Sequence, residues 1–229
     1  MPRQARKAPG GLIYHVLNRA AGKEVLFRHE RDFAGFVRGL HETLERTPIR
    51  ICAFCLMSNH WHLVLWPKGD GELARFMQRL TITHVRRWVI HRHRVGMGPV
   101  YQGRYKSFPV QDDAHFSTLV RYVERNPLRA KLVPRAEQWR WSSLGQIGQV
   151  SNEKVPQIPI CPWPVQRCKD WVEWVNQPQT NAEMMAVFHA IKHNRPYGSD
   201  SWTARMEKRL GIGPLRERGR PKSEKENAK

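Results

Sequence analysis

Two histidines separated by one tryptophan, His60 and His62, have the type and spacing to bind a metal ion. They lie in an apolar run that favours a β-strand, Met57-Ser-Asn-His-Trp-His-Leu-Val. Because side chains two positions apart on a strand point to the same face, both imidazoles would face one side, where neutral imidazole nitrogens can hold a metal. Alternatively, the two histidines are polar side chains that are satisfied by hydrogen bonds and bind no metal. A catalytic site therefore needs a third ligand and a reacting group from elsewhere in the chain.

Tyr122 and Asn126 could supply these two groups. They lie four positions apart in a helical pattern, so one face of the helix would carry both a phenol and an amide oxygen. Tyrosine is a weak nucleophile because its ordinary pKa is about 10, but a metal-polarised phosphodiester lowers the demand on it. Two structural alternatives stay open: a tyrosine at the edge of the core, and an asparagine that ends the helix before Pro127.

The charge balance indicates a polyanionic partner. The 229 residues carry 39 Lys and Arg against 20 Asp and Glu, a net charge of +19 with an isoelectric point near 10.5. Nucleic acid is the leading candidate. A membrane surface is the competing one, but no apolar run approaches the roughly 20 residues that span a bilayer. We expect a cytoplasmic, nucleoid-associated protein, and the candidate DNA contacts are Arg19, Arg104, Lys106, Arg125, Arg129, Arg218 and Arg220.

The four cysteines do not have the spacing of a structural metal site. Cys52 and Cys55 lie in an apolar strand pattern, where positions three apart are expected to face opposite sides, so we interpret both as buried small side chains. Cys161 and Cys168 lie in a proline-rich stretch without a second tight pair. We expect neither a zinc site nor a disulfide.

Hydrophobic periodicity predicts strands over 11–19, 49–57, 60–66 and 101–110. Helices are expected over 31–45, 72–90 and 113–125, the last ending before Pro127, and further helices over 168–176, 181–193 and 199–210. A shift to proline- and glycine-rich sequence suggests a boundary near residue 150. The pattern predicts an α+β fold, a mainly antiparallel sheet with helices on one face and the histidines on the exposed face.

Several separated motifs together resemble the REP-associated tyrosine transposases, a branch of the HUH superfamily and of the IS200-like transposase family. The two main ones are the segments that contain His60-Trp-His62 and Tyr122-Val-Glu-Arg-Asn126-Pro-Leu-Arg-Ala. The others are Tyr14-His-Val-Leu-Asn-Arg19, Tyr101-Gln-Gly-Arg-Tyr-Lys-Ser-Phe-Pro109, Trp139-Arg-Trp-Ser-Ser143, Arg195-Pro-Tyr-Gly-Ser-Asp-Ser-Trp202 and the Arg-Gly-Arg-Pro-Lys ending.

The resemblance implies a ferredoxin-like HUH domain over 1–150 and a helical C-terminal extension over 151–229, whose basic tail contacts DNA. It implies Mg²⁺ or Mn²⁺ held by His60, His62 and Asn126, with Tyr122 attacking single-stranded DNA to form a 5′-phosphotyrosine and a free 3′-OH. The implied partners are hairpins of repetitive extragenic palindromes (REP), bound by a monomer or a homodimer and without a membrane. Imidazole suits zinc better than Mg²⁺, so Mg²⁺ would need further oxygen ligands. The alternative is a DNA or RNA hairpin-binding regulator without catalysis.

Overall fold

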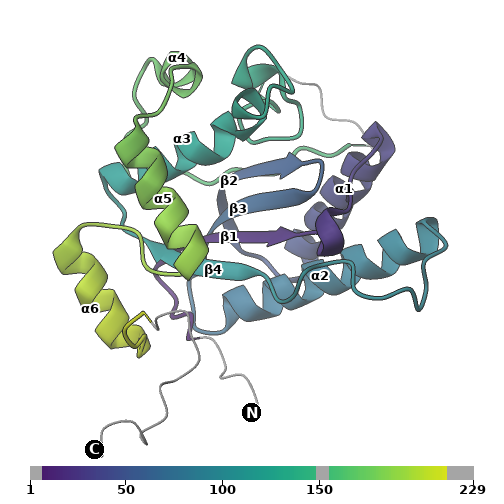
Figure 1. Ribbon diagram of the computed structural model, residues 1–229, viewed down its shortest axis with the longest axis horizontal. Helices are drawn as coiled ribbons and strands as arrows, with labels where there is room; N and C mark the ends of the chain where they lie inside the picture. The colour runs from purple at the N-terminus through teal and green to yellow at the C-terminus, as the bar shows by residue number, and fades with distance from the viewer. Residues whose placement is uncertain (1–6, 148–154, 216–229) are drawn as a thin grey trace, which may run out of the picture.

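A four-stranded antiparallel sheet lies at the centre of the computed structural model, which describes residues 7–147 and 155–215 (Figure 1). Its strands are β1 (Ile13–Arg19), β2 (Arg50–Met57), β3 (His60–Trp66) and β4 (Lys106–Val110), in the order β2-β3-β1-β4. The predicted hairpin is confirmed, because Met57 pairs with His60 across the two-residue turn. The fourth strand is shorter than predicted, and Tyr101 forms only an isolated bridge to Ala20.

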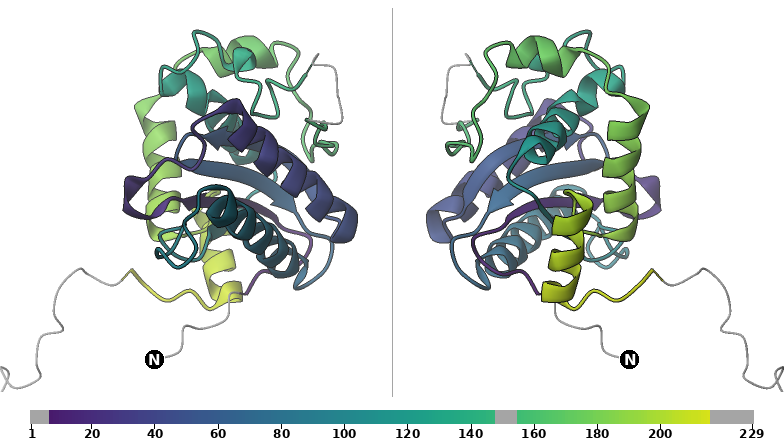
Figure 2. Two further views of the ribbon diagram at one scale, coloured as in Figure 1. Left: turned by 90° about the vertical axis from the view of Figure 1, so that its right-hand side faces the viewer. Right: turned by 90° about the vertical axis from the view of Figure 1, so that its left-hand side faces the viewer.

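Helices cover both faces of the sheet (Figure 2). On one side lie α1 (Glu30–Arg46) and α2 (Glu72–His91), and on the other lies α3 (Ala114–Arg129). The α+β class is confirmed, but the expectation that helices cover one face is wrong. The reason is that β2 and β3 are buried along nearly their whole length: Leu63 packs toward α1 and α2, whereas Val64 packs toward α3. The face that carries the histidines is therefore covered.

Helix α3 continues through Pro127 to Arg129, four residues past its predicted end at residue 125. Proline has no N–H and would leave the carbonyl of Val123 without its helical donor. The side-chain Nδ2 of Asn126 lies 3.4 Å from that oxygen and 3.1 Å from the carbonyl oxygen of Tyr122, and donates to both. The asparagine thus satisfies the carbonyl group that the proline leaves free. Sequence reasoning weighed only the backbone cost of the proline.

An irregularity in β2 changes the orientation of one cysteine. The pairing register with β3 shifts between Ile51 and Ala53, so Cys52 and Cys55 both pack in the core on the α3 side. The expectation of opposite faces is therefore wrong, although both side chains are buried as predicted.

Other segments cover both edges of the sheet. At the β2 edge, Leu56 exchanges hydrogen bonds with the Trp139-Arg-Trp-Ser-Ser143 segment: its N–H donates to Trp141 O at 2.9 Å, and its carbonyl accepts from Trp139 Nε1 at 2.8 Å. At the β4 edge, Tyr197 forms a bridge to Val110. Covered edges prevent pairing with a second sheet.

The C-terminal extension packs against the α3 side of the core. Its described helices are α4 (Trp171–Asn176), α5 (Asn181–His193) and α6 (Asp200–Leu210). Two short 3-10 helices, η1 (Ala21–Lys23) and η2 (Ala136–Gln138), lie earlier in the described residues. The buried carboxylate of Glu124 on α3 accepts hydrogen bonds from Ser143 Oγ at 2.6 Å and Trp171 Nε1 at 2.8 Å.

The predicted boundary near 150 falls outside the described residues. Among the described helices, none is long and apolar enough to cross a membrane.

Candidate active site

The structure brings four predicted residues together around one pocket of about 930 Å³: His60, His62, Tyr122 and Asn126. The two imidazole centroids lie 5.0 Å apart, and the Tyr122 ring centroid lies 6.0 Å from that of His62. The two histidines lie on the same face of β3 because side chains alternate along a strand. Trp61 between them points into the core on the opposite side. One turn of α3 separates Tyr122 from Asn126.

Each of the two histidines has one ring nitrogen engaged in a hydrogen bond and one outside it. His60 Nδ1 lies 2.7 Å from Asn59 Oδ1, which leaves Nε2 as the nitrogen outside that hydrogen bond. His62 Nδ1 is hydrogen-bonded at 2.9 Å, while its Nε2 is buried and has no partner. A buried polar atom without a partner is costly, so the orphaned Nε2 fits a ligand that completes it. These two residues fit a divalent ion.

Asn126 is differently placed as a third ligand. Its Oδ1 accepts a hydrogen bond from Arg129 Nη2. That guanidinium would have to release the oxygen before a cation could bind it. Across the described ranges, no three His, Cys, Asp or Glu side chains are grouped to hold a metal. A cation here would therefore depend on two imidazoles and on oxygen atoms, including those of a bound phosphate.

Burial keeps the site histidines neutral. Desolvation, with smaller contributions from Arg19 and Arg129, lowers the pKa of His60 from 6.5 to about 4. The same cause, with His60 and His15 next, holds the pKa of His62 well below 6.5. Burial also raises the pKa of Tyr122 above 10, against the opposing effect of Arg129. Near neutral pH the imidazoles can therefore bind a metal, while the phenol keeps its proton.

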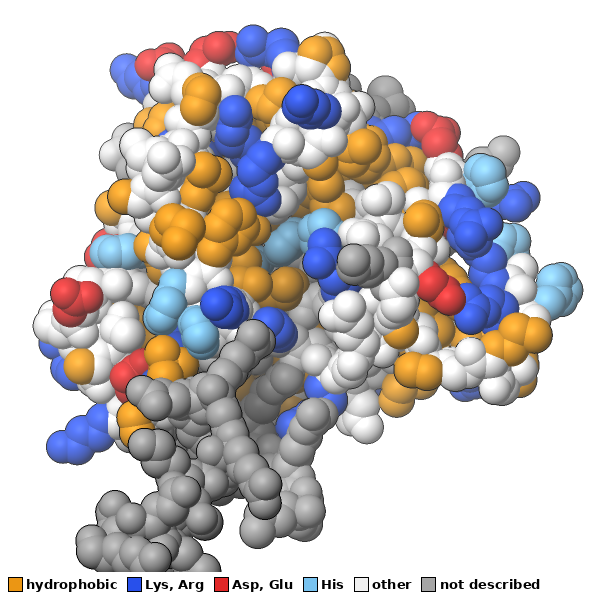
Figure 3. All heavy atoms as spheres, in the orientation of Figure 1, with side chains coloured by type: hydrophobic (Ala, Val, Ile, Leu, Met, Phe, Trp, Pro, Cys, Tyr) orange, Lys and Arg blue, Asp and Glu red, His pale blue; other side chains and the backbone are white. Residues whose placement is uncertain are grey.

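The pocket is cationic. Its lining includes Arg19, Arg104, Lys106 and Arg129, and no described residue that lines it is acidic. Histidine, lysine and arginine side chains gather around the hollow on this face of the molecule (Figure 3). The guanidinium of Arg129 lies over the Tyr122 ring, 4.3 Å from its centroid, and Arg129 Nη1 is buried without a partner. These features suit a phosphodiester beside the phenol.

The remaining predicted DNA contacts differ in their placement. Lys106 lines the pocket, but its Nζ also donates to the carbonyl oxygen of Ile191 at 2.9 Å. Arg125 is not among the lining residues, because its Nη1 donates to the carbonyl oxygens of Val175 and Asn176, at 2.8 and 2.5 Å, at the end of α4. Arg218 and Arg220 lie outside the described residues.

Sequence reasoning missed two neighbours of the site. His15 on β1 is hydrogen-bonded to His62, and its only sequence signal was its place in the motif Tyr14-His-Val-Leu-Asn-Arg19. Phe188 on α5 forms an edge-to-face contact with Tyr122, with centroids 5.8 Å apart. No local pattern distinguishes Phe188 from other apolar residues of its helix. Only the packing of the extension brings it to the pocket.

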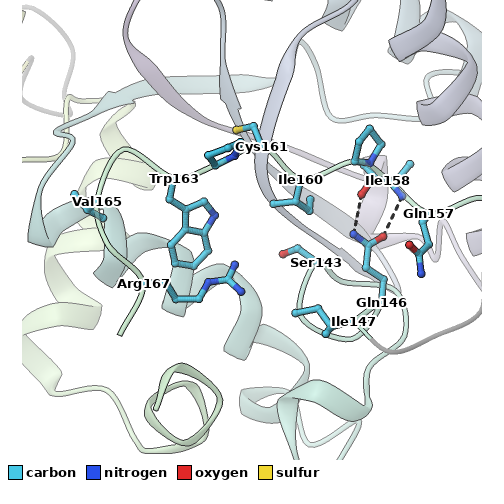
Figure 4. Close-up of a pocket in the computed structure, with 12 residues that line it drawn as sticks. Ser143, Gln146, Ile147, Gln157, Ile158, Ile160, Cys161, Trp163, Val165 and Arg167 are labelled. Atoms are coloured by element: carbon cyan, nitrogen blue, oxygen red, sulfur yellow. Dashed lines mark hydrogen bonds between the residues drawn. The ribbon is translucent and has the colours of Figure 1, made fainter. Parts of the chain in front are cut away.

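A second pocket, of about 850 Å³, lies beside the covered edge of β2 (Figure 4). Gln146 there exchanges hydrogen bonds with the backbone of Ile158, and Trp163 and Arg167 form another part of the lining. None of the predicted catalytic side chains lines it. We therefore place the candidate chemistry at the histidine pocket.

Comparisons with known proteins concern the fold and the family of the chain. A solved structure of a REP-associated tyrosine transposase bound to a REP hairpin superposes with a TM-score of 0.51 at 15% sequence identity, covering 70% of this chain and 99% of that one. At this identity the likeness concerns the fold. No curated protein matches the chain. The family model described as "Transposase IS200 like" matches residues 10–126, which include both histidines, Tyr122 and Asn126. With just over half of its residues in that match, the chain belongs to the IS200-like transposase family.

Proposed function

We propose that this transposase is a REP-associated tyrosine transposase, which cuts and joins single-stranded DNA at palindromic hairpins with Tyr122 as the nucleophile. The observation that carries the proposal is the meeting of Tyr122, the orphaned His62 Nε2 and Arg129 in one cationic pocket. The similarity to a transposase bound to a REP hairpin supports the substrate class.

In the proposed reaction, the Tyr122 oxygen attacks a phosphorus atom of single-stranded DNA. A bond forms between that oxygen and phosphorus, the bond from phosphorus to the 3′-oxygen breaks, and the departing oxygen takes up a proton to become a 3′-OH. The phenol loses its proton in the same step. Joining is the reverse reaction with a different 3′-OH.

His60, His62 and Asn126 would hold Mg²⁺ or Mn²⁺ for this reaction. When bound, such an ion neutralises charge on the phosphate and stabilises the leaving oxygen. Arg129 bridges the two parts of the site, since it bonds Asn126 Oδ1 and lies over Tyr122. We infer that an incoming phosphate attracts this guanidinium and frees the Asn126 oxygen for the cation.

Phe188 gives the pocket a surface for a base. Its side chain is 40% exposed although it contacts the nucleophile, and aromatic rings stack the bases of single strands without sequence preference. Helix α5 thus forms one wall of the site. A nucleotide next to the cleaved phosphate would lie against this wall. The same pocket is also lined by Gln102, Gly103 and the cationic Arg104.

The test is cleavage of labelled single-stranded hairpin DNA, drawn from repeats near the gene, with Mn²⁺, Mg²⁺ or a chelator. We expect cuts at one position that require the metal and disappear in His62→Ala. Tight hairpin binding without cleavage on any repeat would favour the non-catalytic regulator. RNA hairpins that displace DNA at equal concentration would favour an RNA-binding function instead.

A further inference from the structure

We propose that His15 is a positioning residue that holds His62 in the tautomer able to bind a metal, an inference that rests on the proposed function. His15 is fully buried on β1, and its Nε2 lies 2.9 Å from His62 Nδ1. The two rings are within 7° of parallel, with centroids 5.0 Å apart. His15 accepts the hydrogen bond from His62 Nδ1–H, and the lone pair of His62 Nε2 then faces the pocket.

Only one of two proton arrangements leaves His62 able to bind a metal through Nε2. A hydrogen bond between two neutral imidazoles contains one proton, which belongs either to His62 Nδ1 or to His15 Nε2. If His15 donated, His62 would carry its own proton on Nε2 and would present an N–H to the pocket. A metal ligand needs a lone pair at that position, so His15 must act as the acceptor.

The pocket charge favours this arrangement before a metal arrives. Each arrangement leaves one buried N–H without a partner, since neither His15 Nδ1 nor His62 Nε2 has one. The count of hydrogen bonds is therefore equal in both. The lining of the pocket contains arginines and a lysine but no acidic side chain, and this positive field favours a lone pair over an N–H dipole at His62 Nε2.

The acceptor is held rigidly. His15 lies on a central strand, where it pairs with Val64, and Leu17 two residues later pairs with His62 itself. The Phe108 ring packs against His15 at 79° with centroids 5.1 Å apart, and the His15 side chain is fully buried. A fixed acceptor fixes the orientation of the donor ring, as outer partners of metal-binding histidines do.

The variants that test this are His15→Phe, which removes the acceptor, and His15→Gln, which restores one. His84→Gln is the matched control, because His84 is also a buried histidine in a hydrogen bond, to the Tyr101 hydroxyl, but packs on the α1 and α2 side of the sheet. The readout is the affinity for Mn²⁺ without DNA. We expect His15→Phe to weaken Mn²⁺ binding about 10- to 100-fold, as loss of an outer partner does. His15→Gln should recover most of the affinity, and His84→Gln should not change it.

Histidine-selective ¹⁵N NMR of the metal-free protein gives a second readout that a purely structural role would not move. We expect the proton on His62 Nδ1, with a coupling across the hydrogen bond to His15 Nε2. A His62 proton on Nε2, or unchanged Mn²⁺ affinity in a folded His15→Phe, would overturn the inference. A wild-type protein that binds no Mn²⁺ would contradict the proposed metal site, whereas the NMR tautomer would still decide the role of His15.

Discussion

At the scale of the residue, the site is a set of buried polar groups whose contacts leave specific atoms free. His62 Nε2 and Arg129 Nη1 are both buried without partners and belong to the same pocket. One suits a cation and the other suits an anion, and a metal-bound phosphate would satisfy both. The spacing made His60, His62, Tyr122 and Asn126 candidates, and the resemblance to the REP-associated tyrosine transposases implied their roles. The sequence could not predict which atom of each is free, because hydrogen-bond partners such as His15 come from other strands.

Arg129 is expected to act in the chemical step. Replacing it with alanine removes the cation beside the phenol and should slow DNA cleavage about 10²- to 10³-fold, the usual loss for one transition-state donor. Binding of Mn²⁺ without DNA should be unchanged or tighter, because Asn126 Oδ1 loses its competing donor. Single-turnover cleavage and Mn²⁺ titration measure the two effects. Equal losses in both assays would show that Arg129 only supports the fold.

His84 makes the stability of the protein sensitive to acid. Burial lowers the pKa of His84 from 6.5 to about 3, so between these values the unfolded chain binds a proton that the folded protein does not. The free energy of unfolding therefore falls as pH drops below about 6.5, with a contribution of at most about 1.4 kcal/mol per pH unit from this residue. In His84→Gln the difference in unfolding free energy between pH 7 and pH 5 should shrink. Urea denaturation at both values tests it, and an unchanged difference would contradict the assignment.

At the scale of the element, strand β3 and two helices from different parts of the chain form the site. Helix α3 carries Tyr122 and Asn126 through a turn that contains Pro127, and α5 closes the pocket from the extension. The strands β2 and β3 and the helix over 181–193 follow the sequence pattern closely, because their apolar periodicity is strong. The end of α3 does not, since the Asn126 side chain satisfies a carbonyl group that Pro127 leaves free. Side-chain capping of this kind is not contained in backbone propensity.

Phe188 tests the contribution of α5. Its replacement by alanine removes the stacking surface and should weaken single-stranded DNA binding by about 1–3 kcal/mol, the range for one stacked base. Met185→Ala is the matched control, since Met185 lies on the same helix, is 66% exposed and does not line the pocket. Fluorescence anisotropy with a labelled oligonucleotide measures both variants. Equal affinities for the two would argue against a base beside Phe188.

At the scale of the whole molecule, the net charge of +19 includes four cationic side chains, and no acidic one, in the lining of the histidine pocket. The sequence predicted the polyanionic partner from its charge alone. It could not distinguish cations that line the pocket from those that form hydrogen bonds within the fold. Arg104 and Arg125 are both arginines, and the sequence does not show their different contacts. The structure separates them: Arg104 lines the pocket, and Arg125 bonds the carbonyl oxygens at the end of α4.

The salt dependence of hairpin binding should reveal that difference. Each phosphate contact adds about 0.7 to the slope of log affinity against log salt concentration for single strands. Arg104→Ala should therefore reduce the slope by about that amount. Arg125→Ala should leave the slope unchanged and lower the thermal stability instead. A reduced slope in Arg125→Ala would restore this residue as a DNA contact.

The central claim is that Tyr122 attacks the DNA phosphate, and mass spectrometry of the reacted protein tests it most directly. After incubation with Mn²⁺ and a cleavable hairpin, followed by nuclease and protease digestion, we predict a nucleotide attached to the peptide that contains Tyr122. The adduct should be absent from Tyr122→Phe and from a chelated reaction. Cleavage that persists in Tyr122→Phe, or an adduct on another residue, would contradict the account.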